Sequence, residues 1–171
     1  MNLDIILEKY ENWYQPLHET TNYFRGFSLK FFIPDISSLI RDGNISTALD
    51  YGCGKAELHT TYSLQKLWDL KKLDRYDPGV KEWSNLPSQS YDLVFCIDVM
   101  EHIEEHDVDN ILYHIYGLTN KVAFFSISTR PAKKNLLDGT NAHKTIQPEQ
   151  WWRKKIDSIF KDKLAIVNFS L

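Results

Sequence analysis

The chain has 171 residues, of which 43% are hydrophobic and 25% charged, and its net charge is −3. This balance is that of a folded globular protein, and it excludes an intrinsically disordered chain. The sequence contains no run of about 18 apolar residues, so no membrane-spanning segment is predicted.

The N-terminal part is predicted to form a helical and lid segment over residues 1–44. A polar, aromatic stretch at 10–27 comes first. A helix is then predicted over 28–41, with Ser28 as its N-cap and Asp42-Gly43-Asn44 as its stop. Because proline at position 34 cannot donate a backbone hydrogen bond, a kink or a later helix start is expected.

Strand and helix signals alternate from residue 45 to the end of the chain, which is the predicted core of a single domain spanning 1–171. Apolar runs predict strands at 46–51, 72–76, 92–97, 121–128 and 163–170. Apolar residues at helical spacing predict helices at 57–68, 107–118 and 147–160. The expected fold class is therefore α/β, an open, twisted, mainly parallel sheet with helices on both faces. In such a sheet, ligands bind beyond the carboxyl ends of the strands.

A glycine turn, Gly52-Cys53-Gly54, follows the first predicted strand. Glycine is needed where the backbone turns with positive φ or where a ligand comes too close for a β-carbon. Asp50 lies on the strand two residues before the turn, where its carboxylate can face an ammonium group. Asp77 ends the second strand, where it can accept both hydroxyls of a ribose. Alternatively, Asp77 starts an Asp-Pro-Gly turn.

A nicotinamide dinucleotide is the competing ligand for such a turn. Its fingerprint requires a third glycine, so that helix and strand pack closely beneath a pyrophosphate. Glu57 occupies that position and would repel a phosphate. Dinucleotide binding is therefore disfavoured.

Three segments, LDYGCGKA, DRYDPGV and YDLVFCIDVMEHIEE, resemble successive motifs of class I S-adenosylmethionine-dependent methyltransferases. The resemblance covers roughly residues 46–128. It implies a Rossmann-like fold in which the turn Gly52-Cys53-Gly54 approaches the methionine end of S-adenosylmethionine. It further implies that Asp50 holds the amino group, Asp77 holds the ribose and Asp98 borders the sulfonium.

The sequence departs from that family pattern in three places. Ala56 replaces the usual third small glycine, and the third strand between Val80 and Pro87 is compressed. The chain also ends where a final antiparallel strand is expected. The sheet is therefore expected to be shortened at its C-terminal edge, or to pair there with a second copy.

The run Asp98-x-x-Glu101-His102, together with the distant His143, offers carboxylate and imidazole groups suited to Mg²⁺ or Mn²⁺. This set is similar to the metal site of small-RNA 2′-O-methyltransferases. It also resembles metal-free members, in which the Glu-His pair shapes the pocket. His102 and His143 are the candidate catalytic bases if the methyl acceptor is a hydroxyl.

The long loop after the predicted strand at 121–128, residues 130–144, carries Arg130, Lys133 and Lys134. Residues 1–120 hold 10 basic and 19 acidic residues, a balance of −9, whereas residues 121–171 hold 10 and 4, a balance of +6. The last third of the chain could therefore attract an anion, or simply form a solvated basic face. At the other end, Tyr23-Phe24-Arg25-Gly26 could fold over the cofactor as a lid or pack as an ordinary helix.

The predicted function is methyl transfer from S-adenosylmethionine to an oxygen or nitrogen nucleophile of a small or anionic acceptor. The alternatives are a metal-assisted enzyme acting on RNA or a sugar hydroxyl, and a non-catalytic S-adenosylmethionine-binding scaffold subunit. Residues 1–14 lack the pattern of a secretory signal. Cys53 and Cys96 fall in strand-like contexts that favour reduced, buried thiols. A cytoplasmic protein without membrane contact is therefore expected.

Overall fold

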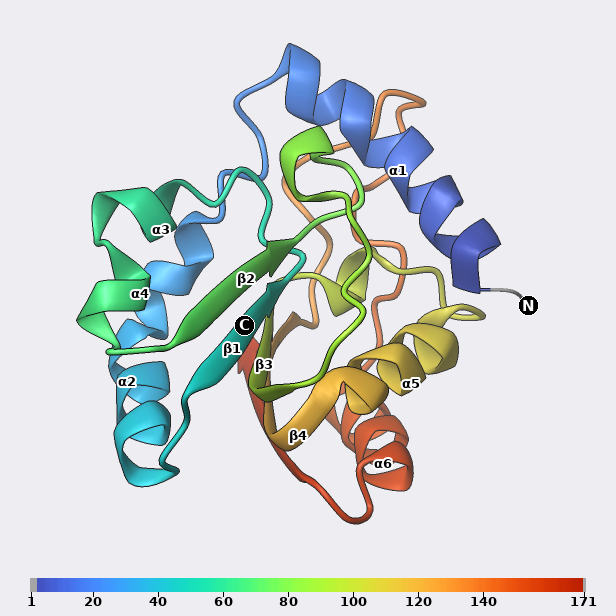
Figure 1. The fold of residues 1–171 in the computed structure, drawn as a ribbon. Coiled ribbons are helices and arrows are strands. Elements are labelled where there is room, and N and C mark those ends of the chain that lie inside the picture. Colours follow the sequence, from blue (N-terminus) through green and yellow to red (C-terminus); the bar gives the residue numbers. More distant parts are fainter. Residues whose placement is uncertain (1–2, 171) are drawn as a thin grey trace.

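The computed structural model describes residues 3–170 and contains a five-stranded sheet of order β2-β1-β3-β4-β5 (Figure 1). Its strands are β1 (Thr47–Tyr51), β2 (Lys72–Tyr76), β3 (Tyr91–Ile97), β4 (Thr119–Ser128) and β5 (Leu164–Ser170). All neighbouring pairs are parallel. The strand predictions are confirmed to within two residues at each end.

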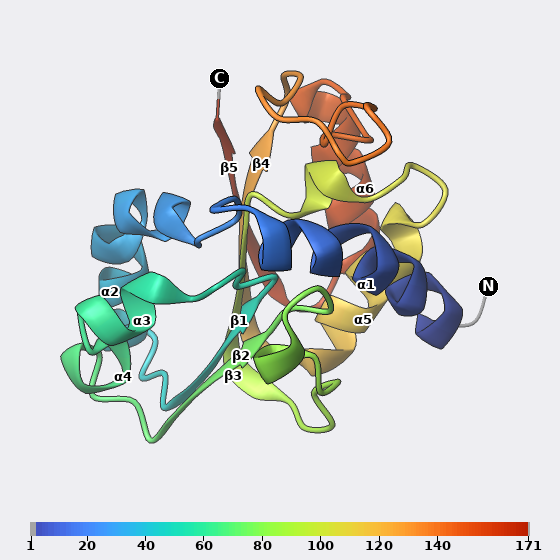
Figure 2. The same cartoon turned by 90° about the horizontal axis from the view of Figure 1, so that it is seen from above.

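Helices cover both faces of this sheet (Figure 2). One face carries α2 (Ile33–Asp42), α3 (Glu57–Thr61) and α4 (Leu64–Leu67), and the other carries α1 (Leu3–Thr20), α5 (Val108–Leu118) and α6 (Glu149–Ile159). The expected α/β architecture, an open parallel sheet between two helical layers, is confirmed.

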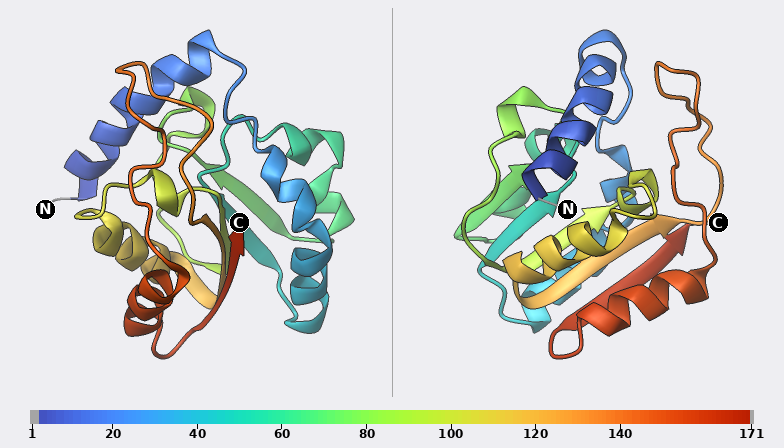
Figure 3. Two further views of the ribbon diagram at one scale, coloured as in Figure 1. Left: turned by 180° about the vertical axis from the view of Figure 1, so that it is seen from behind. Right: turned by 90° about the vertical axis from the view of Figure 1, so that its right-hand side faces the viewer.

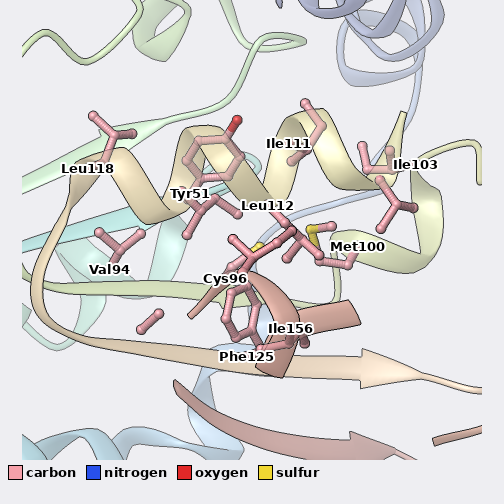
Figure 4. Close-up of a cluster of buried hydrophobic side chains, with 14 of the residues drawn as sticks. Tyr51, Val94, Cys96, Met100, Ile103, Ile111, Leu112, Leu118, Phe125 and Ile156 are labelled. Carbon is pink, nitrogen blue, oxygen red and sulfur yellow. The ribbon is translucent and has the colours of Figure 1, made fainter. Parts of the chain in front are cut away.

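The central strands β3 and β4 are apolar along almost their whole length because both of their faces are covered. Successive side chains point to opposite faces, so Val94 and Cys96 pack beneath α5, whereas Leu93 and Phe95 pack beneath α2 and α4. The α5 side of the core includes Phe125 and is drawn in Figure 4. Both cysteines are buried and free.

The N-terminal helix α1 covers residues for which the sequence predicted only a polar, aromatic stretch from residue 10, and it includes Pro16. Its buried residues Ile6, Leu7, Tyr10 and Leu17 recur at helical spacing, which is the signal that identifies it. Figure 3 shows α1 near the carboxyl end of the sheet. The N-terminal segment therefore forms part of the packed domain.

Two predicted helices are broken in the structure. The stretch predicted over 28–41 is divided into a 3₁₀ helix, η1 (Phe27–Phe31), and α2, which begins just before Pro34. The helix therefore starts later than residue 28, as the proline at position 34 predicted, because a proline ring is tolerated in the first turn of a helix. The stretch predicted over 57–68 is divided into α3 and α4 at Ser63, which has a φ of 48°.

The two sheet edges follow the departures seen in the sequence. The segment between β2 and β3 holds only a 3₁₀ helix, η2 (Lys81–Trp83), so β2 is an edge strand. At the other edge, β5 pairs with β4 from Leu164 to Ser170, and no antiparallel strand joins the sheet within residues 3–170. None of the helices described for this range is both long enough and apolar enough to cross a bilayer.

The strand order places the topological switch point between β1 and β3. From β1 the chain moves outward to β2, and it then returns to β3 and moves the other way through β4 to β5. Loops leaving β1 and β3 therefore diverge, which leaves a crevice at the carboxyl ends of these strands.

Replacing Phe125 by alanine tests the core, because Phe125 is a large, fully buried side chain on an inner strand. We expect Phe125→Ala to lower the free energy of unfolding by about 3–5 kcal/mol, from lost apolar burial and the cavity left behind. Chemical denaturation monitored by circular dichroism measures this change. Tyr113→Ala on the exposed side of α5 is the control, and an equal loss in both variants would contradict the described core.

Candidate functional site

A cavity of about 580 Å³ lies at the carboxyl ends of β1, β2, β3 and β4. Its volume is within the range of small-molecule sites, about 300–1,000 Å³. It is lined by every residue that the sequence singled out as a candidate for cofactor, catalytic or metal binding: Asp50, Gly52, Cys53, Gly54, Asp77, Asp98, Glu101, His102 and His143. Topology thus brings together side chains that are far apart in the sequence.

The glycine turn is closely packed against another part of the protein. Gly54 has a φ of +56°, and a β-carbon there would lie 2.1 Å from the carbonyl oxygen of Phe24. A β-carbon on Gly52 would lie 2.3 Å from the side chain of Val99. Both glycines are therefore required by contacts within the chain itself.

The segment that packs on this turn, residues 22–27, is called the strap here. The Lys55 amide donates to the Phe24 carbonyl at 3.0 Å, and the Arg25 guanidinium binds both carboxylate oxygens of Glu57. This bond to Arg25 lowers the pKa of Glu57. The strap lines the cavity, which is the position that a lid over the site would have. Glu57 forms an ion pair with Arg25 of the strap.

Asp50 is held from behind by a residue that the sequence did not point to. His59 on α3 places its Nε2 2.7 Å from Oδ2 of Asp50, and both side chains are buried. The pairing fixes the carboxylate and leaves Oδ1 for a ligand. The sequence gives no sign of this role, because His59 lies on the crossover helix after β1 and only the packing of that helix brings it beside Asp50.

Asp77 joins the two turns that follow β1 and β2. Its Oδ2 accepts from the Gly54 amide at 2.8 Å and its Oδ1 from the Gly79 amide at 2.9 Å. Burial raises the pKa of Asp77 to about 6, although these two hydrogen bonds oppose the shift. The sequence predicted that Asp77 either binds a ribose or starts a turn. In the structure its carboxylate bonds to the turn and also lines the cavity.

Asp98 ends β3 in a left-handed conformation, with a φ of 53°. This conformation is uncommon for a residue with a side chain and is found mainly in turns and functional sites. Oδ1 accepts a hydrogen bond from the Ser126 hydroxyl at 2.7 Å. The side chain is half-buried at the cavity wall.

Glu101 lies in the 3₁₀ helix η3 (Met100–His102) and is completely buried. Oε1 accepts from the Ser128 amide at 2.9 Å, whereas Oε2 has no hydrogen-bond partner. Burial, followed by the negative charge of Asp98, raises the pKa of Glu101 to about 8. A carboxyl group with an unsatisfied oxygen in a cavity wall is costly for folding, which is typical of a functional group.

His102 and His143 face each other edge to face, with ring centroids 4.8 Å apart. Nδ1 of His102 lies 2.9 Å from the Ala142 carbonyl, and Nδ1 of His143 lies 2.5 Å from the Arg130 carbonyl. Because a carbonyl oxygen only accepts hydrogen bonds, Nδ1 of each ring carries a proton and donates it. Nε2 of each ring is then free to accept a hydrogen bond from a ligand. Burial and the neighbouring His143 lower the pKa of His102 to about 3, so this ring is neutral.

The four predicted metal ligands do not converge on one point. Asp98 bonds to Ser126, Glu101 to Ser128, and both imidazoles use Nδ1 on backbone carbonyls. Within residues 3–170, the one group of three potential ligands with atoms inside 4.8 Å of one another lies elsewhere, and it consists of Glu104, His106 and Asp107. The Lys9 ammonium is already bound to Glu104 and Asp107 in that group.

Helix α1 contributes a cavity wall that the sequence did not predict. Tyr14 lies beside His102, with its hydroxyl 3.2 Å from Nδ1, and His18 lies 3.8 Å from Asp77. Burial lowers the pKa of His18 to about 4, so it is neutral beside the Asp77 carboxyl. A β-carbon on Gly79 would lie 2.7 Å from the Tyr14 side chain, which shows how closely α1 is packed on this turn.

Comparison of the chain with protein-family models and with curated proteins finds no match. The site must therefore be interpreted from its own geometry.

Glu101→Gln tests the buried carboxyl. The folded protein holds this proton up to pH of about 8, whereas the unfolded chain releases it near 4.5, so folding stability falls as pH rises between these values. We expect Glu101→Gln to be more stable than the wild type at pH 9 by about 2–4 kcal/mol and similar to it at pH 5. Urea denaturation at both pH values measures the difference. Glu8→Gln, on the exposed face of α1, is the control, and a parallel pH profile for wild type and Glu101→Gln would refute the assignment.

Gly54→Ala tests the contact between the glycine turn and the strap. The new β-carbon would collide with the Phe24 carbonyl, so we expect a lower melting temperature and faster tryptic cleavage after Arg25. Gly139→Ala is a matched control, because Gly139 also has a positive φ, 81°, but open space around it. Equal effects of the two substitutions would show that backbone strain alone is responsible.

Proposed function

We propose that this chain is an S-adenosylmethionine-dependent methyltransferase that acts on an oxygen or nitrogen nucleophile of a small or anionic acceptor. The observation that carries the proposal is the grouping of Asp50, Asp77 and Asp98 at the ends of three adjacent strands, around a glycine turn at the switch point. Fold alone would not support it, because parallel α/β sheets host many functions.

The charges of the cavity suit the proposed cofactor. S-adenosylmethionine carries an ammonium group, a sulfonium and two ribose hydroxyls, all of which favour carboxylates as neighbours. Asp50 has one oxygen free of His59, and Asp98 has one oxygen free of Ser126. A phosphorylated nucleotide would meet repulsion from the same carboxylates, so the acidic floor favours the sulfonium compound.

The chain's own residues would act mainly by positioning. The cofactor supplies an electrophilic methyl group when bound, and transfer by in-line displacement requires the nucleophile to be aligned with it. The strap and Tyr14 would exclude water from the cavity. His102 and His143 would accept a hydrogen bond from the acceptor through Nε2 and orient its nucleophile.

Metal assistance has less support than direct transfer, because the candidate ligands are engaged separately with backbone and serine groups. Measuring S-adenosylhomocysteine release from a metabolite mixture, with EDTA or with added Mg²⁺ or Mn²⁺, separates the alternatives. Release in EDTA supports the proposal, and release only with metal supports the metal-assisted enzyme. Cofactor binding without any release supports a scaffold.

Asp77→Asn tests the proposed ribose contact. We expect the affinity for S-adenosylhomocysteine to fall about 10- to 100-fold, from the loss of charge-assisted hydrogen bonds of roughly 1.5–3 kcal/mol. Isothermal titration calorimetry below the melting temperature measures this change. Asparagine retains one acceptor for the glycine amides, which alanine would leave unsatisfied. Asp157→Asn on the exposed side of α6 is the control, and an unchanged dissociation constant for Asp77→Asn would contradict the ribose assignment.

The same ligand should bind more weakly in acid. Because the pKa of Asp77 is about 6, the carboxylate that accepts ribose hydroxyls becomes protonated as pH falls from 7 to 5. We expect S-adenosylhomocysteine affinity to fall about tenfold in all between pH 7 and pH 5, with little change between pH 8 and pH 7. Calorimetry at pH 5, 6, 7 and 8 measures the profile, and Asp77→Asn should flatten it. A wild-type profile that is flat over this range would count against a role for Asp77.

A further inference from the structure

Three cations line the mouth of the cavity on the loop between β4 and α6. Arg130, Lys133 and Lys134 are exposed and belong to the cavity wall. None of them takes part in the ion pairs found among residues 3–170, whereas Arg25 on the opposite wall is paired with Glu57. Their charges are therefore available to a ligand.

The loop that presents these cations has a defined structure. The Asn141 side chain forms two hydrogen bonds of 2.9 Å with the backbone of Ala132, and the Ala142 amide donates to the Lys134 carbonyl at 3.1 Å. Leu136 and Ala142 are buried against Leu17 of α1. The backbone that carries the cations is thus held in place next to α1.

Lys134 links this loop to the strap across the mouth. Its ammonium lies 4.6 Å from the ring centroid of Tyr23 and 5.1 Å from that of Phe24, and the partial burial of this group lowers its pKa. The mouth is consequently cationic and aromatic, while the floor carries Asp50 and Asp98. A molecule entering it would turn its anionic end to the mouth and its opposite end to the floor.

We propose that the methyl acceptor is a small molecule bearing a phosphate group, which Arg130, Lys133 and Lys134 bind at the cavity mouth. This inference rests on the proposed methyltransferase function and names the acceptor class for it. A guanidinium and two ammonium groups suit the three oxygens of a phosphate, Arg130 through paired donors and the lysines as point charges. The nucleophile at the other end of the acceptor would then face His102 and His143.

The charge of the chain favours a compact anion over a nucleic acid. Residues 1–120 have a balance of −9 and the whole chain −3. On α6 and the turn that follows it, Lys155 is paired with Asp109, and Lys163 donates to the Tyr116 carbonyl. A long polyanion extending beyond the mouth would meet the acidic majority of the chain, whereas a small phosphate ester would not.

Inorganic pyrophosphate is the probe for this anion site, because it needs neither the cofactor nor the acceptor. We expect the wild type to bind it with a dissociation constant on the order of 1 mM by calorimetry at low salt. The combined variant Arg130→Gln/Lys133→Gln/Lys134→Gln should bind it at least tenfold more weakly and retain S-adenosylhomocysteine affinity within about threefold. Lys66→Gln/Lys154→Gln/Lys161→Gln removes the same charge from exposed sites outside the cavity and should bind pyrophosphate like the wild type.

Several outcomes would overturn the inference. These are a wild type that does not bind pyrophosphate, a loop variant that binds it normally, and a control variant that loses as much affinity as the loop variant. Displacement of pyrophosphate by a single-stranded RNA of about 20 nucleotides, with steep salt dependence, would assign the loop to nucleic acid instead. A wild type that binds S-adenosylhomocysteine but not pyrophosphate would contradict this inference alone, whereas a wild type that does not bind S-adenosylhomocysteine would contradict the proposed function.

Discussion

The arrangement of the site depends on the Asp77 carboxylate, which accepts hydrogen bonds from the Gly54 and Gly79 amides. These two amides belong to the turns after β1 and β2, so one buried side chain fixes both turns at the carboxyl edge of the sheet. Burial makes this carboxylate costly, and its raised pKa expresses that cost. The strap then packs on the Gly54 backbone where no side chain would fit.

Around this point the molecule separates opposite charges. Carboxylates line the floor of the cavity at the ends of β1, β2 and β3, and unpaired cations line its mouth after β4. The imidazoles of His102 and His143 also line the cavity, and each uses Nδ1 on a backbone carbonyl. Such an arrangement would suit the two proposed ligands, a cationic cofactor and an anionic acceptor.

Stability and function conflict most clearly at Glu101. The side chain is completely buried, one oxygen has no partner, and its pKa is raised to about 8. If this position served packing alone, an apolar side chain of similar size would make the folded protein more stable than glutamate does. Glu101 also lines the candidate site, where a buried carboxyl group with a pKa of about 8 could donate a proton near neutral pH.

The sequence by itself determined the parallel α/β sheet, the strand positions and the candidate residues at the strand ends, because burial on two faces and turn chemistry are local properties of the chain. The compressed segment after β2 could also be read from it. Only the tertiary structure decided that α1 with Tyr14 and His18 forms a wall, that His59 holds Asp50, and that the strap occupies the space above Gly54. It also decided that no three of the four suggested metal ligands have ligand atoms within 4.8 Å of one another. These features depend on contacts between residues distant in sequence, whose distances and hydrogen bonds are set only when the elements pack together.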